Sequence, residues 1–314
     1  MTDLVVKPVG RFAPSPTGQL HLGNLRTALA SWLSVKSRGG KWIVRIEDID
    51  TARCRAELAD QHLRDLAALG LESDEPVVWQ SRRGDLYREA LDKLAKQGKL
   101  YRCACSRKDL QLLASALQSE DNLKPYPGTC RAAKIGEFIA DALRLELPPG
   151  EVHWNDLLLG EQSDDPVSLT GDPVLHRRDG CFAYHLAVVV DDGRQGVNEI
   201  VRGADLREVT STQIRLQQML GYSCPNYAHL GLVTAPDGSR LGKRVDSASL
   251  SSLIADGISV PEIIGWLGWT LGCQDFPDAC RAEDLIGRFT WNRVRKDSVS
   301  VPAGWVLTNA GDSF

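Results

Sequence analysis

The chain has 314 residues, of which 43% are hydrophobic and 25% are charged, and its formal net charge is −4. This composition predicts a folded globular protein with one large or two modest domains and excludes a disordered or fibrous chain. The slightly negative charge argues against general attraction to nucleic acid, so such a contact requires a local basic face. No signal-peptide pattern and no apolar run of membrane-spanning length is found, which predicts a cytoplasmic protein with no membrane partner.

The N-terminal segment predicts a strand, a loop, a helix and a second strand. Residues 9–12 are expected to form the first strand, and apolar residues recur at helical spacing from Leu25 to Leu33. Residues 41–47 alternate strictly, which places Arg45 and Glu47 on one face of the second strand. Such a unit is parallel and right-handed by default.

The loop inside this unit runs from Arg11 to Asn24 and reads RFAPSPTGQLHLGN. A loop opened by glycine at a helix N-terminus suits phosphate, because free N–H groups and the positive end of the helix dipole face the anion. His21 adds a donor and Asn24 adds an amide at the first turn. Without further signals, a proline-kinked turn before a core helix would explain the same composition.

The remaining elements follow in chain order. Helices are expected at 51–70, 87–99, 211–220, 261–271 and around 282–289. A near-continuous apolar strand is expected at 181–190 and a shorter strand at 199–201. The polar, cysteine-bearing stretch 101–166 reads as an insertion that does not continue the sheet. We therefore divide the chain into two halves of one domain (1–100 and 167–247), this insertion, and a short helical C-terminal region (248–314).

Five motifs in this order identify a known family. After the loop come RIEDID (45–50), FAYHLAVVVDD (182–192), IVRGADL (200–206) and RLGKR (240–244). Together they resemble the catalytic domain of the class I glutamyl-tRNA synthetases, with His21-Leu22-Gly23-Asn24 in the HIGH position. The resemblance implies an α/β fold with a Rossmann-like doubly wound parallel sheet, a zinc-type insertion and a short helical tail.

The segment after the last motif is too short for the helical anticodon-binding region of glutamyl-tRNA synthetases. In this respect the chain resembles their truncated paralogues, the glutamyl-queuosine tRNA(Asp) synthetases. That resemblance implies a ligase that activates L-glutamate with ATP and Mg²⁺. Its acceptor would be the queuosine base in the anticodon of tRNA(Asp), and we expect a monomer.

Charge logic matches the implied substrate, because glutamate carries two carboxylates and one ammonium group. Arg11 and Arg202 suit the carboxylates, Glu47 suits the ammonium group, and Tyr184 can donate its hydroxyl. As single residues, the charged three would more often be surface ion-pair partners. The loop adds two further contacts to glutamate, from Ala13 and Ser15.

The resemblance assigns catalysis to His21 and Lys243. The expected ATP-binding residues are His21, Gly23, Asn24, Lys243 and Arg244. The lysine loop departs from the family pattern, because Arg240 replaces the first lysine and Gly242 replaces a serine. Lys243 keeps the position whose ammonium group stabilises charge on the α-phosphate. A solvated basic turn is the alternative for this loop.

The eight cysteines are expected to be free thiols or metal ligands in a reducing compartment. Cys103, Cys105 and Cys130 lie in the insertion, and a structural zinc site needs four ligands. The paralogue family completes its site with tyrosine, and Tyr126 stands at the matching place. Buried free cysteines are the alternative. The other cysteines, Cys54, Cys181, Cys224, Cys273 and Cys280, lack ligand spacing.

Several further residues receive no role at this stage. The Asp191–Asp192 pair is interpreted as part of a turn after a strand. The histidines interpreted as packed or solvated are His62, His153, His176, His185 and His229.

Two other functions compete with the leading hypothesis. One is a compact glutamyl-tRNA synthetase that charges the acceptor end of tRNA(Glu). The other is a non-catalytic binding module descended from a synthetase. The presence of His21, Gly23 and Lys243 argues against the module, and the absence of an anticodon-binding region argues against the compact synthetase.

Overall fold

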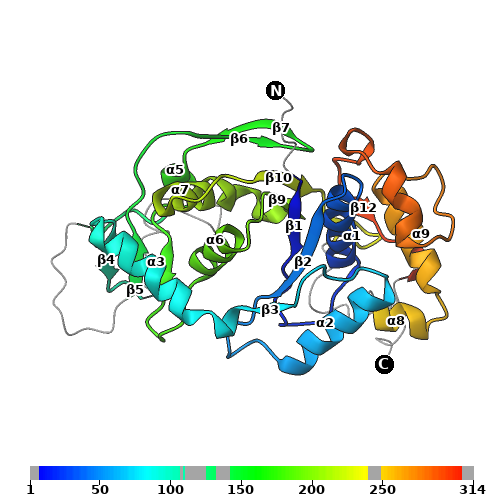
Figure 1. Cartoon of the computed structure of the whole chain (residues 1–314), viewed down its shortest axis with the longest axis horizontal. Coiled ribbons are helices and arrows are strands. Elements are labelled where there is room, and N and C mark those ends of the chain that lie inside the picture. Colours follow the sequence, from blue (N-terminus) through cyan, green and yellow to red (C-terminus); the bar gives the residue numbers. More distant parts are fainter. Residues whose placement is uncertain (1–6, 107–108, 110–124, 132–141, 240–248, 306–314) are drawn as a thin grey trace.

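The structure is a computed structural model that describes residues 7–106, 109, 125–131, 142–239 and 249–305. Its central sheet stands between two groups of helices, as Figure 1 shows. One group contains α1 and α9, and the other contains α3, α6 and α7. Each face of the sheet is thus buried, as a parallel sheet requires.

The central sheet has seven strands in the order β3-β2-β1-β9-β10-β6-β7. Its neighbouring strands run parallel except at the edge, where β7 pairs antiparallel with β6. Its strands are β1 (Val9–Phe12), β2 (Lys41–Ile46), β3 (Val78–Trp79), β6 (Val152–Asp156), β7 (Gly160–Asp164), β9 (Glu199–Gly203) and β10 (Asn226–Leu230). The strand order reverses direction between β1 and β9, which is where doubly wound sheets bind ligands. The predicted fold class is confirmed.

Strand β2 keeps the predicted alternation. Trp42, Val44 and Ile46 pack in the same core as α1 (Leu22–Lys36), whereas Ile43 packs on the opposite face. Arg45 is fully buried on that opposite face. The side-chain period of two therefore delivers a charged residue into the interior.

The remaining helices agree with the expected pattern in most places. They are α2 (Ala56–Ala68), α3 (Gly84–Lys96), α5 (Pro166–Leu169), α6 (Tyr184–Arg194), α7 (Thr210–Leu220), α8 (Leu250–Ala255) and α9 (Val260–Thr270). Short 3₁₀ helices cover Gln80–Arg82, Ala204–Val209, Ala282–Arg288, Trp291–Arg293 and Ala303–Trp305. The helix expected around 282–289 is therefore a 3₁₀ helix.

The strand expected at 181–190 is wrong, because residues 184–194 form helix α6. Residues 186–192 are all buried, and α6 packs against α3 and α7. An apolar run buried on every side carries no periodicity, so a buried helix and a buried strand look alike in sequence. The fold is still Rossmann-like, because the central sheet is formed by β3, β2, β1, β9, β10, β6 and β7 without residues 181–190.

The expectation that residues 101–166 stand outside the sheet is wrong for β6 and β7, which form one edge of it. A separate antiparallel sheet in the order β4-β5-β8 contains the start of this stretch. Its strands are β4 (Leu100–Cys103), β5 (Ala142–Leu145) and β8 (Val174–His176). Strand β6 does alternate buried and exposed residues, but its five residues are too few to stand out in a polar context.

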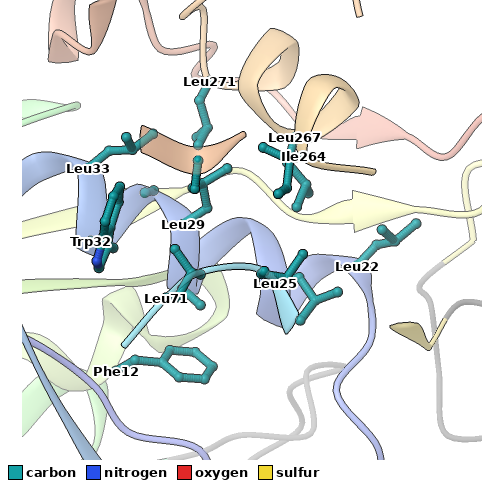
Figure 2. Packing of buried hydrophobic residues seen from close by; sticks show 14 of the residues in the cluster. Phe12, Leu22, Leu25, Leu29, Trp32, Leu33, Leu71, Ile264, Leu267 and Leu271 are labelled. Carbon is teal, nitrogen blue, oxygen red and sulfur yellow. The ribbon is translucent and has the colours of Figure 1, made fainter. Parts of the chain in front are cut away.

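The C-terminal helices share the core of α1. Figure 2 shows Leu25 and Leu29 of α1 beside Ile264 and Leu267 of α9. Arg26 is buried at this contact and donates hydrogen bonds to the Gly231 carbonyl (2.7 Å) and to Thr270 Oγ1 (3.1 Å). The C-terminal region is thus part of the same packed body as the first helix. Nearby, β11 (Val233–Thr234) pairs with β12 (Val299–Ser300).

Candidate active site and metal centre

The loop after β1 is fixed by its neighbours at both ends. The Glu47 N–H donates to the Pro14 carbonyl (3.0 Å), which joins the loop to the end of β2. His62 of α2 bonds the Gly18 carbonyl through Nε2 at 2.8 Å. Among the predicted contacts, Ala13 is half-buried and Ser15 is exposed in this loop. The loop is therefore preorganised above the carboxyl end of β1.

His21 is the N-cap of α1. Its Nδ1 accepts from the N–H groups of Gly23 (3.1 Å) and Asn24 (3.4 Å), and the Asn24 side chain accepts from the His21 N–H (3.2 Å). Because Nδ1 is an acceptor, the neutral ring carries its proton on Nε2. Burial lowers the pKa of His21, which favours this neutral form. The N–H groups that were expected to face phosphate are occupied by the imidazole instead.

Gly23 is required by this cap. A Cβ at Gly23 would lie 2.9 Å from His21 Cε1 and 3.0 Å from Nδ1, closer than carbon atoms pack. Gly23→Ala should therefore displace the ring and lower kcat for glutamate-dependent pyrophosphate exchange by about tenfold or more, the scale of a misplaced catalytic group. Gly18→Ala is the control, because a Cβ there meets nothing within 4 Å. Equal activity of the two variants would contradict the role of the cap.

The expected glutamate contacts come together at the carboxyl ends of the strands. Arg11 lies in β1, Glu47 follows β2 and Arg202 lies in β9, whereas Tyr184 is the first residue of α6. Burial raises the pKa of the Tyr184 hydroxyl, and the charges of Arg202, Glu47 and Arg11 all act on it. The three charged residues of the expected glutamate site therefore all influence the pKa of Tyr184. The structure brings these residues together as the motifs suggested.

A buried network supports the Arg11 side of this cluster. Arg45 donates to Asp192 (2.8 Å) and lies 3.4 Å from Glu47, and Arg11 Nε bonds Asp192 at 3.3 Å. Burial raises the pKa of Glu47 to about 7, more than Arg45 and Arg11 lower it. Among the described residues, Nη2 of Arg11 has no hydrogen-bond partner. This guanidinium group retains donors that a carboxylate could use.

The interpretation of Asp191 and Asp192 as a turn is wrong, because both lie buried in the last turns of α6. Asp191 accepts from Arg83 Nε (2.6 Å) and from the Tyr87 hydroxyl (2.7 Å). Buried carboxylates need cationic or hydrogen-bonding partners, and these partners come from distant parts of the chain. Two acidic residues directly after an apolar run were the available signal.

The Arg202 guanidinium group is held by three hydrogen-bond acceptors. It donates to His229 Nε2 (3.1 Å), Gln213 Oε1 (2.6 Å) and Thr210 Oγ1 (2.7 Å). His229 was given no role from sequence, yet it is fully buried at this position. Asp205 was also missed, although its charge acts to raise the pKa of His21. Lys243 and Arg244 lie outside the described residues.

The predicted metal ligands form one cluster. The Sγ atoms of Cys103, Cys105 and Cys130 lie within 4.8 Å of one another. The Tyr126 hydroxyl lies 3.5 Å from Cys103 Sγ and 3.8 Å from Cys105 Sγ. Tetrahedral zinc with bonds of about 2.3 Å to sulfur separates its ligands by roughly 3.8 Å. These positions fit a four-coordinate ion without large movement.

The chemistry of the donor set also fits a cation. Burial raises the pKa of Cys103, but hydrogen bonds from Tyr126 and Arg144 lower it by a larger amount, so that the pKa falls to about 7. The cluster therefore supplies a thiolate near neutral pH. Tyr126 is fixed by a backbone bridge to Gly171, where φ is +63° and a Cβ would collide with the Tyr126 backbone. The position of Tyr126 beside the cysteine cluster is thus determined by its backbone contact with Gly171.

The chain matches the family described as tRNA synthetases class I (E and Q), catalytic domain, over residues 7–302. It therefore belongs to this family of class I synthetases. A curated relative named glutamyl-Q tRNA(Asp) synthetase from Symbiobacterium thermophilum is 43% identical, and the match covers 96% of this chain and 98% of the relative. A relative of the same name from Chromobacterium violaceum is 46% identical over 94% and 95% of the two chains.

A solved structure supports the same placement. The glutamate tRNA ligase from Elizabethkingia meningosepticum is 25% identical and superimposes with a TM-score of 0.81, covering 96% of this chain and 68% of that one. In the part of the chain that the structure describes, no helix combines the length and hydropathy needed to cross a bilayer. The fold and the sequence match therefore agree on the family.

Proposed function

We propose that this protein is a ligase that activates L-glutamate with ATP and transfers it to the queuosine base of tRNA(Asp). The observation that carries the first half is that Arg11, Glu47 and Arg202 lie at the carboxyl ends of the adjacent strands β1, β2 and β9, with Arg11 and Glu47 linked through Asp192 and Arg45. The acceptor follows from relatives of nearly the same length that are named glutamyl-Q tRNA(Asp) synthetase. The whole catalytic body, C-terminal helices included, would perform both steps.

In this proposal, each charge of glutamate has an opposite charge in the site. Arg11 and Arg202 bind the two carboxylates, and Glu47 binds the ammonium group. Tyr184, Ala13 and Ser15 complete the amino-acid contacts. ATP with Mg²⁺ lies beside His21, Gly23 and Asn24, and Lys243 with Arg244 neutralises charge on the phosphates. The Nε2–H of His21 can donate to a phosphate oxygen.

Transfer to a base has a chemical parallel in ordinary charging. Queuosine carries adjacent hydroxyls on a cyclopentene ring, which resemble the ribose diol that attacks an aminoacyl adenylate. An unstacked anticodon base is also the part of an RNA that most readily enters a protein site. The same activated glutamate can therefore react with a base instead of a terminal ribose.

The acceptor is tested with tRNA(Asp) from which the terminal adenosine has been removed. Glutamate transfer should persist on this RNA and should vanish on intact tRNA(Asp) that lacks queuosine. The matched control is tRNA(Glu) with an intact acceptor end, which should remain uncharged. Transfer that depends on the terminal adenosine and ignores queuosine would instead identify a compact glutamyl-tRNA synthetase.

The pKa of Glu47 predicts the pH dependence of glutamate binding. Since burial raises this pKa to about 7, the carboxylate that attracts the ammonium group is lost as pH falls through 7. The KM for glutamate should therefore rise on the acid side, while the KM for ATP changes less. Pyrophosphate exchange measured between pH 6 and 8 checks this. A Glu47→Gln variant should bind weakly at every pH and lose the titration near 7.

We further propose one structural zinc ion per chain, held by Cys103, Cys105, Tyr126 and Cys130. When bound, the ion would supply a fixed crosslink between the strand β4 and the segment 125–131. We expect elemental analysis of purified protein to find about one zinc, the content of a single closed site. Its loss should impair transfer to RNA more than glutamate activation, because the cluster lies in the insertion.

Cys130→Ser should lower the zinc content, since it removes a thiolate ligand from a soft metal. Cys224→Ser is the matched control, because Cys224 is exposed and lies outside the thiol cluster. Full zinc content in Cys130→Ser would assign the metal to other residues. A metal-free wild type with full transfer activity would leave these thiols as core residues only.

A further inference from the structure

Behind Arg202 lies a buried chain of polar groups that no step of the proposed reaction uses. Asp156, at the end of β6, bonds His229 Nδ1 at 2.6 Å. His229 Nε2 lies 3.1 Å from Arg202 Nε. The side chains of Asp156 and His229 are completely buried. Arg202 and Thr210, which lie within hydrogen-bond distance of His229 Nε2, are buried as well. Such a chain is costly to bury unless every member is satisfied.

The hydrogen-bonding partners fix which nitrogen of His229 carries the proton. Asp156 is ionised. Burial raises its pKa, but hydrogen bonds from His229 and from the Leu159 N–H lower the pKa by a larger amount. A carboxylate can only accept, so Nδ1 of His229 must donate to it. Arg202 Nε can only donate, so Nε2 of His229 must accept. Both conditions are met by the neutral ring protonated on Nδ1, and burial lowers the pKa of His229 in the same direction.

We propose that Asp156 and His229 are positioning residues that fix the tautomer and thereby hold the Arg202 guanidinium in place for a carboxylate of glutamate. This inference rests on the proposed function, in which Arg202 binds that carboxylate. Gln213 and Thr210 hold the two outer nitrogens, so the His229 bond to Nε sets the rotation of the guanidinium plane. A planar fork must be oriented before it can bind a carboxylate through two bonds.

The backbone around Asp156 determines which of its two carboxylate oxygens bonds His229. The other oxygen of Asp156, Oδ1, accepts from the N–H groups of Leu158 and Leu159, both at 2.9 Å. In an Asp156→Asn variant, the amide oxygen must keep these two bonds, which turns the NH₂ group toward His229. Nδ1 must then accept, and the proton moves to Nε2, where it faces the Arg202 N–H and finds an acceptor only in Thr210 Oγ1, 3.1 Å away, among the described residues. The nearly isosteric change thus reverses the tautomer and repels the guanidinium group.

The test measures glutamate-dependent pyrophosphate exchange with full-length protein. Asp156→Asn and His229→Phe should each raise the KM for glutamate by about 10- to 100-fold, the scale of one lost hydrogen bond to a charged group. The KM for ATP should change by less than about threefold, since Arg202 does not contact ATP in the proposal. His229→Gln, which restores an acceptor for Arg202, should recover much of the glutamate affinity. His153→Phe, on the exposed face of β6, is the matched control.

A spectroscopic measurement separates positioning from a general structural role. The imidazole ¹⁵N shifts of His229 should show the Nδ1–H tautomer in the wild type and the Nε2–H tautomer in Asp156→Asn. An unchanged KM for glutamate in both Asp156→Asn and His229→Phe would overturn the inference, as would equal increases for ATP and glutamate. A wild type without any glutamate-dependent exchange would overturn the proposed function itself, so the two failures are distinguishable.

Discussion

Replacing Arg202 with leucine should lower kcat/KM for glutamate in pyrophosphate exchange by about 10²- to 10³-fold, the usual result of removing one partner of a buried charge pair. The side chain is buried, and its planar group is already held by Gln213 and Thr210. A substrate carboxylate would therefore lose a preorganised partner and meet a desolvated surface instead. Most of the loss should appear in the KM for glutamate.

Two further variants make this result specific. Arg202→Lys keeps the charge but loses the planar fork, so its activity should lie between those of the wild type and Arg202→Leu. Arg215→Leu changes a half-buried arginine of α7 that donates to the Gly150 and Glu151 carbonyls, and it should leave exchange nearly unchanged. Equal activity of Arg202→Leu and Arg215→Leu would move the carboxylate site away from β9.

Arg45→Met should lower the free energy of unfolding by about 3–5 kcal/mol, the cost of leaving buried charges without their partner. Arg45 is fully buried, and its guanidinium group lies within 3.8 Å of Asp191, Asp192 and Glu47. Removing it leaves three buried carboxylates, whose charge Arg11 and Arg83 offset only in part. Urea denaturation followed by circular dichroism measures the change.

The matched control lies in the same strand. Lys41 forms an ion pair with Glu75 at the surface, where solvent screens the charges. Lys41→Met should leave the urea midpoint unchanged within error. If Arg45→Met had an equally small effect, the buried network would be no more stabilising than a surface pair.

Much of the fold could be predicted because its signals are local. The alternation in β2 and the helical spacing after Gly23 are read from neighbouring residues. Helix α6 could not be assigned in this way, since residues 186–192 are buried all round and carry no period. Strand β6 was missed because its alternation spans only five residues, and its place in the central sheet depends on β10, about seventy positions later in the chain.

In the candidate site, too, local sequence signals could be recognised, whereas contacts between distant residues could not. Arg11, Glu47, Tyr184 and Arg202 could be proposed from sequence because each stands inside a recognisable motif. The groups that hold them, including Asp192 and His229, were missed because their roles exist only once distant segments meet. Asp156 and His229, for example, are separated by 73 residues. A motif indicates which residues are expected to contact the substrate, whereas the residues that support them are recognised only in the folded structure.

The contact between α1 and α9 has a consequence for the order in which the protein is made. Arg26 and its partner Thr270 are 244 residues apart, so the cover of α1 is synthesised long after α1 itself. At about 5–20 residues per second, the first helix leaves the ribosome roughly 12–50 s before α9. During this interval α1 lacks the cover that Ile264 and Leu267 of α9 later provide. The core around α1 is therefore completed only after α9 has been synthesised.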